Sequence, residues 1–290
     1  MLSQSGIFVT DDVVMHFQDN RQEPSFNNYI CQQIARLKRL GKIRTSETYT
    51  AALRSFSGFV NDKEVLFDQL NADLIAEYEA YLKGRGNSPN TVSFYMRILK
   101  AVYNRAVEDE LTEQRYPFKY VYTGVEKTLK RALSLNAIRR IKGLDLSLKP
   151  NLDYARDMFL FCFYTRGMSF IDMAYLRKKD LQNGILSYRR RKTGQQLFIK
   201  WEKCMQDILD KYPVNETEYL LPIITERNED YRKQYANALH RVNHLLKKIG
   251  KLLDLPIPLT MYVGRHSWAS IAKSRNVPIS VISEGMGLSL

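Results

Sequence analysis

The chain has 290 residues, of which 44% are hydrophobic and 26% are charged, so its composition is that of a globular protein and its length suits two domains. No apolar run approaches the roughly 18 residues of a membrane-spanning helix, and the N-terminus lacks the basic start and long apolar run of a signal peptide. We therefore expect a cytoplasmic protein with no membrane partner. Its three cysteines, Cys31, Cys162 and Cys204, are expected to be reduced core residues.

The net charge of +13 is unevenly distributed along the chain. Residues 1–126 hold 15 Lys and Arg against 16 Asp and Glu, whereas residues 127–290 hold 29 against 15. The positive field therefore belongs to the second part of the chain. A polyanion, most commonly nucleic acid, is the natural partner of such a field. The alternative is a basic surface that binds nothing.

Four helices are expected in the first part of the chain, because apolar residues recur there at helical spacing. Thr45 or Ser46 can cap the second helix and Asn71 the third. Ser88 followed by Pro89 is a strong start signal for the fourth. The expected helices cover residues 30–40 (followed by Gly41), 45–60, 71–82 (followed by Gly84) and 88–106.

A local basic cluster stands out in this nearly neutral part. Five basic residues fall within nine positions around the end of the first expected helix, and such clusters are typical both of solvated helix ends and of edges that contact phosphates. They are candidate DNA-binding residues: Arg36, Lys38, Arg39, Lys42 and Arg44.

The helical pattern breaks over residues 110–130, and we place the domain boundary there. The expected organisation is a lead-in (1–24), a helical domain (25–112), a linker (113–130) and a larger domain (131–290). The larger domain is mainly α with a small β-hairpin at 184–200, whose turn is Thr193-Gly194. Its expected helices cover residues 133–146, 153–165, 203–212, 231–251, 264–274 and 278–286.

Four sequence motifs in this order of elements resemble those of one protein family. SPNTVSFYMRILKAVYNRAVEDE resembles the last helix of the core-binding domain of the tyrosine recombinases, or phage integrases. FCFYTRGMSFIDMAYLRKKDL resembles the segment that carries their first catalytic arginine, and YRRRKTGQQLFI their hairpin lysine. LTMYVGRHSWASIAKSRNVPISVISEGMG resembles the box of their second arginine. The resemblance covers roughly residues 25–287, and the motif sequences are most similar to those of integrases of Bacteroides-type mobile elements.

This resemblance implies a SAM-like core-binding domain, which binds DNA, followed by a tyrosine-recombinase catalytic domain. It implies a site-specific recombinase that cleaves and rejoins double-stranded DNA through a 3′-phosphotyrosine, without cofactor or metal. It also implies a monomer in solution and a tetramer on synapsed DNA. Without a metal, arginines must stabilise the charge on the phosphate oxygens, and a lysine can protonate the leaving oxygen.

Three catalytic candidates follow from the matched motifs. Arg265 stands at the second arginine, at the expected start of a helix, although a salt bridge to a local carboxylate would also explain a buried arginine. Lys192 stands at the hairpin lysine, although it also lies in a basic run that solvent alone could explain. His266 either braces Arg265 or is a core histidine.

The first arginine is a departure from the family pattern, because Ser169 occupies its place. Arg166 precedes Ser169 by three residues, one helical turn, and Arg190 precedes Lys192 by two, on the same side of a strand. We expect either arginine or both to supply the missing guanidinium, with Ser169 as a hydrogen-bond donor. Tyr262 replaces the family's first histidine, and its hydroxyl can still hydrogen-bond a phosphate oxygen.

The nucleophile is unknown, because the family places it after Gly287 and the last tyrosine here is Tyr262. We expect a catalytic domain that is incomplete at its C-terminus, through truncation or through a stretch missing after Gly287. His240 and His244 have the spacing of zinc ligands, but the glutamate of that motif is absent, so no metal is expected. The alternative functions are a DNA-binding, cleavage-incompetent recombinase-like protein and, less well supported, a helical transcription regulator.

Overall fold

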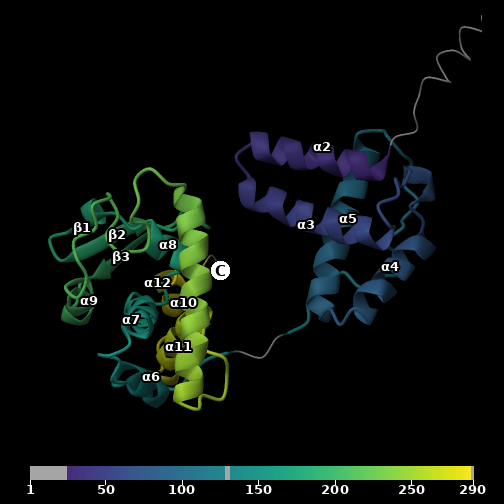
Figure 1. Ribbon diagram of the computed structural model, residues 1–290. Coiled ribbons are helices and arrows are strands. Elements are labelled where there is room, and N and C mark those ends of the chain that lie inside the picture. The colour runs from purple at the N-terminus through teal and green to yellow at the C-terminus, as the bar shows by residue number, and fades with distance from the viewer. Residues whose placement is uncertain (1–24, 128–130, 289–290) are drawn as a thin grey trace, which may run out of the picture. The chain divides into compact units, whose positions relative to one another are not determined.

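The computed structural model describes residues 25–127 and 131–288, which form two compact units that divide between residues 128 and 129 (Figure 1). The expected lead-in of residues 1–24 lies outside the described residues, as do 128–130 and 289–290. No helix of the described residues combines the length and the apolar character that crossing a membrane requires.

The described residues of the first unit form four α-helices and one 3-10 turn. Asn71 and Ser88 cap their helices as predicted, since their side chains accept the backbone N–H of Leu74 (2.9 Å) and of Thr91 (3.3 Å). The expected cap of the second helix is wrong, because that helix already begins at Ile43. Ser46 lies in its first turns and donates its hydroxyl to the Ile43 carbonyl (2.7 Å). The elements are α2 (Phe26–Arg39), α3 (Ile43–Phe59), η1 (Phe67–Gln69), α4 (Ala72–Gly84) and α5 (Pro89–Glu108).

Aromatic rings dominate the core of this unit. Phe26, Phe56 and Tyr78 are fully buried, and their rings meet edge to face, with centroids 5.8 Å apart for Phe26 and Phe56 and 5.2 Å for Phe56 and Tyr78. Each such side chain contributes about 1.5–3 kcal/mol through burial. The predicted inward stripe of the last helix is confirmed at Val92 and Leu99, which are also buried.

Residues 113–127 are not a free linker, which corrects the expected boundary. Phe118 and Val121 are buried in the first core, and the backbone N–H of Arg115 donates to the Tyr103 hydroxyl (3.0 Å). The Ser93 hydroxyl donates to the carbonyl of Gly124. The segment is irregular because of its turns, but its apolar residues hold it against α4 and α5 as part of the first unit.

The second unit surrounds one buried helix, α7, on which α10 and α11 pack (Figure 1). Consecutive residues from Met158 to Cys162 are buried, so α7 presents no solvent face over this stretch. The elements are α6 (Leu135–Lys142), α7 (Pro150–Tyr164), α8 (Phe170–Ala174), η2 (Lys178–Asp180), β1 (Leu181–Gln182), β2 (Ile185–Arg189), β3 (Gln196–Lys200), α9 (Lys203–Leu209), α10 (Tyr231–Leu252), α11 (Met261–Ser274) and α12 (Ile279–Gly285).

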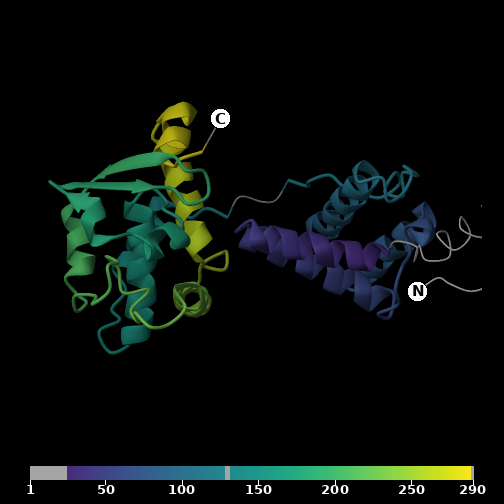
Figure 2. The same cartoon turned by 90° about the horizontal axis from the view of Figure 1, so that it is seen from above.

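The predicted hairpin is confirmed and gains a short third strand, in the antiparallel order β1-β2-β3. Leu186 pairs with Ile199 and Tyr188 with Leu197, and all four side chains are buried on the face toward the core. Figure 2 shows the turn of the hairpin beside the yellow C-terminal segment. The sheet thus carries its turn toward the residues that follow α12.

The cysteines are all unbonded, but only one is a core residue. Cys162 is buried, Cys204 is half-buried and Cys31 is exposed on α2. The expectation of three core cysteines is therefore wrong for Cys31, whose helix buries the opposite face.

Candidate active site

Arg265 lies in the second turn of α11 and is held from two sides. The helix begins at Met261, so the expectation of a helix-start position is wrong. Nη1 of Arg265 donates to the carbonyl of Gly167 (2.6 Å) and Nη2 to that of Met286 (2.8 Å). Within the described residues no ion pair engages this guanidinium, so the alternative of a local salt bridge does not apply. Its partners are neutral oxygens, and its charge remains available to an anion.

Gly167 makes this placement possible. Its φ is +73°, and a Cβ atom on it would lie 2.8 Å from Cα and 2.9 Å from Cγ of Arg265. Its N–H donates to the carbonyl of Cys162 (2.8 Å), which ends α7. The backbone of the segment after α7 therefore lies directly against the stem of Arg265, where a side chain would not fit.

Arg190 is the second guanidinium of the site. It follows β2, is 6% exposed, and donates Nη1 to the carbonyl of Gly287. Its Nε is buried and has no hydrogen-bond partner within the described part of the chain. Burial, and next the nearby charge of Arg190, lower the pKa of Arg265 from its usual range. The two positive charges thus converge on one short segment. An anion bound there would offset both the free-energy cost of burying these charges and their mutual repulsion.

Arg166 lies beside the end of α12 and Lys192 lies in the hairpin turn, and neither has the geometry expected for it. Arg166 has a φ of +59° in the turn after α7, so it does not share a helical face with Ser169. Its Cδ would lie 3.7 Å from a Cβ on Gly285. Lys192 is exposed in the hairpin turn, and because β2 ends at Arg189, strand alternation does not align it with Arg190. Neither Arg166 nor Lys192 has an ion pair within the described residues, so both charges are free.

Asp172 joins the two halves of the site and was not among the predicted site residues. It is 3% exposed and accepts the Ser169 hydroxyl at Oδ2 (2.6 Å) and the Arg191 N–H at Oδ1 (2.9 Å). The Ser169 hydroxyl hydrogen is therefore already engaged, rather than free for a phosphate. An acidic residue inside the apolar run FIDMA was the available sequence signal, because buried carboxylates need partners.

Tyr262 and His266 form a pair on the outer side of α11. Their rings meet edge to face with centroids 4.2 Å apart, and Tyr262 is 64% exposed. His266 is half-buried, so it is not a fully enclosed core histidine. The Tyr262 hydroxyl is open to solvent one helical turn from Arg265.

The candidate DNA-binding cluster surrounds the turn between α2 and α3. Its five basic residues are all exposed, and Arg44 forms an ion pair with Glu47 (3.2 Å). A second basic surface, which sequence reasoning did not single out, is α10. This helix carries six Lys and Arg and no Asp or Glu between Tyr231 and Leu252, and its buried stripe leaves the basic residues exposed. Both surfaces suit a polyanion.

Comparison with known proteins bears on the family and the fold of this chain. Residues 25–122 match the phage integrase SAM-like domain. Tyrosine recombinase XerA of Thermococcus kodakarensis is 25% identical over 223 residues, which cover 75% of this chain and 73% of the relative. The structure of a lambda integrase dimer bound to a COC′ core site has 13% identity and a TM-score of 0.72, and covers 98% of this chain and 79% of its own.

A further solved structure has the same fold. The lambda integrase tetramer bound to a Holliday junction has 12% identity and a TM-score of 0.69, and covers 96% of this chain and 78% of its own. At these identities the solved structures establish the fold, which is that of integrases with a SAM-like domain and a catalytic domain. The domain match, the curated relative and the shared fold together support the tyrosine recombinase family for this chain.

Proposed function

We propose that this chain serves site-specific DNA recombination as the integrase of a mobile element of the Bacteroides type, as its motifs suggest. The observation that carries the proposal is the convergence of Arg190 and Arg265 on the segment after α12, with neither in an ion pair within the described residues. Planar, permanently charged donors in a half-buried site suit a phosphodiester whose charge grows in the transition state.

The chemistry assigned to these residues balances without a cofactor. A tyrosine oxygen attacks the phosphorus, the bond from phosphorus to the 5′ oxygen breaks, and a 3′-phosphotyrosine forms. Lys192 gives its proton to the leaving oxygen, while Arg265 and Arg190 hold the non-bridging oxygens. One phosphoester replaces another, so rejoining by the 5′-hydroxyl restores the starting bonds.

The other candidates take supporting parts in this proposal. Arg166, free beside Gly285, adds a third guanidinium at the edge of the site. Ser169 acts through Asp172, which ties it to the hairpin turn. Tyr262 offers an exposed hydroxyl to a phosphate oxygen, and His266 holds its ring in place.

Double-stranded DNA is the proposed partner of both units. The cluster around the turn of α2 and α3 and the basic face of α10 supply contacts to backbone phosphates. The proposed assembly is a monomer in solution and a tetramer on synapsed DNA. The likeness to a lambda integrase tetramer bound to a Holliday junction supports the second of these states.

The test should not depend on the attacking tyrosine, since none follows Tyr262 in this sequence. A nicked duplex, randomised around the nick and carrying a 3′-p-nitrophenyl phosphate, meets this need. The strand's own 5′-hydroxyl attacks the phosphorus and p-nitrophenolate leaves, so absorbance and the length of the joined strand both report the reaction. We expect joining by the unaltered chain, and losses of about 100- to 1000-fold for Arg265→Ala and Arg190→Ala.

The matched control is Arg177→Ala, which removes an exposed arginine whose partner is Glu218 and should leave joining unchanged. Full activity in the Arg190→Ala variant would assign the missing guanidinium elsewhere, and Arg166→Ala would then be decisive. Duplex binding without any joining by the unaltered chain would favour the cleavage-incompetent alternative. Absence of duplex binding would refute the proposed function altogether.

A further inference from the structure

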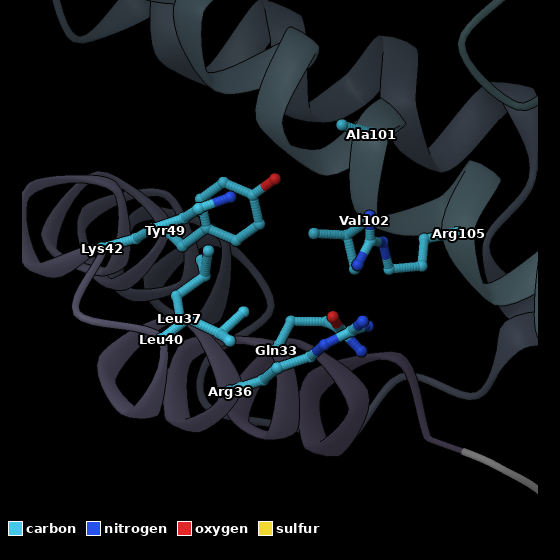
Figure 3. A pocket seen from close by; sticks show the side chains of 9 residues that line it. All are labelled: Gln33, Arg36, Leu37, Leu40, Lys42, Tyr49, Ala101, Val102 and Arg105. Carbon is cyan, nitrogen blue, oxygen red and sulfur yellow. The ribbon is translucent and has the colours of Figure 1, made fainter. Parts of the chain in front are cut away.

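A pocket of about 190 Å³ lies in the first unit, and none of the residues discussed as catalytic lines it. It opens between the end of α2, the start of α3 and the second half of α5 (Figure 3). Leu37 and Val102 contribute an apolar wall, and Tyr49 closes one side. The volume has room for several water molecules or for one phosphate group.

The polar groups of this pocket lack partners. Gln33 is only 8% exposed as a residue, but its side-chain amide keeps access to solvent and has no hydrogen-bond partner within the described residues. Arg36, Lys42 and Arg105 also line the pocket, and none of the three forms an ion pair in the described part of the chain. Figure 3 shows the polar ends of Gln33, Arg36 and Arg105 directed into the same space.

The acidic groups at the end of α5 form no ion pair with these cations within the described residues. Glu108 is the last residue of α5, and Asp109, which follows it, accepts the hydroxyl hydrogen of Tyr29. The pKa of Tyr29 is raised by burial and then by this carboxylate, and it is lowered by the charges of Arg105 and Arg36. Three cations around one cavity repel one another, and the amide of Gln33 lines the same cavity. A tetrahedral oxyanion would satisfy the amide and all three cations at once, because arginine pairs with phosphate through two parallel hydrogen bonds.

We propose that this pocket holds one backbone phosphate of duplex DNA, with Gln33, Arg36 and Arg105 as its direct donors and Lys42 as a further positive charge. This inference rests on the proposed function and adds Gln33 and Arg105 to it. A phosphodiester is favoured over a free phosphate because exposed Lys38 and Arg39 continue the positive surface beyond the pocket. The site fixes the position of the first unit along the duplex rather than reading its sequence.

The test compares variants of the whole chain by fluorescence anisotropy with a labelled duplex over a range of salt concentrations. Arg105→Ala should weaken binding about tenfold and lower the slope of log K against log salt by about 0.9. Gln33→Leu keeps the charge and should weaken binding without changing the slope. Arg105→Lys should retain the slope. Circular dichroism and thermal unfolding establish that each variant is folded.

Lys63→Ala is the matched control, because it removes one exposed charge from a groove that also contains Glu64, Asp73 and Glu77. A change in slope for Arg105→Ala equal to that for Lys63→Ala would overturn the inference while leaving the proposed function intact. Failure of the unaltered chain to bind the duplex would instead overturn the proposed function. Titration with inorganic phosphate tests whether the pocket binds free phosphate instead of a DNA phosphodiester. Tight binding of free phosphate that Arg105→Ala abolishes, with an unchanged salt slope on DNA, would make this a free-phosphate site and refute the proposal.

Discussion

Replacement of Gly167 by alanine tests how rigidly the structure holds Arg265. The new Cβ would lie 2.8 Å from Cα of Arg265, whereas carbon atoms pack comfortably at about 3.5–4.0 Å. One of the two backbones must therefore move, and overpacking of this kind costs about 1–3 kcal/mol. The left-handed φ of +73° adds a further cost of about 1–2 kcal/mol for any residue with a Cβ.

Gly194→Ala is a matched control for the free-energy cost of placing a Cβ at a left-handed φ. Gly194 has the same φ of +73°, but a Cβ there would have nothing within 4 Å. Both variants lower the conformational entropy of the unfolded chain in the same way, so this effect cancels when their stabilities are compared. Thermal unfolding of the second unit should therefore show Gly167→Ala melting about 5 °C below Gly194→Ala, since roughly 2–4 °C corresponds to 1 kcal/mol for a domain of this size. Equal melting temperatures would refute the close packing of Gly167 on Arg265.

Two further predictions concern the core of the second unit. Burial raises the pKa of Cys162 to about 12, so above about pH 9 the unfolded state holds fewer protons than the folded state, and the free energy of unfolding falls as the pH rises. In urea unfolding between about pH 9 and 12, the free energy of unfolding of the Cys162→Ala variant should therefore fall by about 1.4 kcal/mol less per pH unit than that of the unaltered chain. The same pH dependence in both proteins would contradict the assignment. Asp157, 2% exposed, accepts hydrogen bonds from Arg156, Lys211 and Tyr212, so Asp157→Ala should cost about 3 kcal/mol in the same assay. Asp207→Ala breaks only the exposed pair with Lys203 and should cost less than about 1 kcal/mol, so similar losses for the two variants would argue against a buried network.

The local parts of the fold were predictable from the sequence, because they depend on residues close together in the chain. The caps at Asn71 and Ser88 and the hairpin around Thr193-Gly194 each rest on short-range hydrogen bonds or turn chemistry. Most helices were placed within a few residues for the same reason. The start of α3 was misplaced because Lys42, which makes no side-chain cap, precedes it.

The features that the sequence did not predict are contacts between distant segments. Residues 113–127 look like a linker because they lack periodicity, and only Phe118 and Val121 in the first core reveal them as part of that unit. The placement of Arg190 depends on its meeting with Gly287, 97 residues later. Arg190 was nominated because strand alternation would align it with Lys192, which the end of β2 at Arg189 rules out. Only the tertiary structure distinguishes it from Arg189 and Arg191, whose side chains are exposed.

The carbonyl oxygens of Met286 and Gly287 have a consequence for selectivity at the candidate active site. They already accept hydrogen bonds from Arg265 and Arg190, so an incoming phosphate that took these donors would enter by exchange rather than by simple addition. The affinity is then a difference between two hydrogen-bonded states. The Gly287 carbonyl also accepts the Thr193 hydroxyl (3.4 Å), and each guanidinium has further N–H groups, so a phosphodiester can offer its two non-bridging oxygens, one to each arginine. The short segment after α12 therefore occupies part of the hydrogen-bonding capacity of both arginines, and an anion binds through the N–H groups that remain or by exchange with these carbonyls.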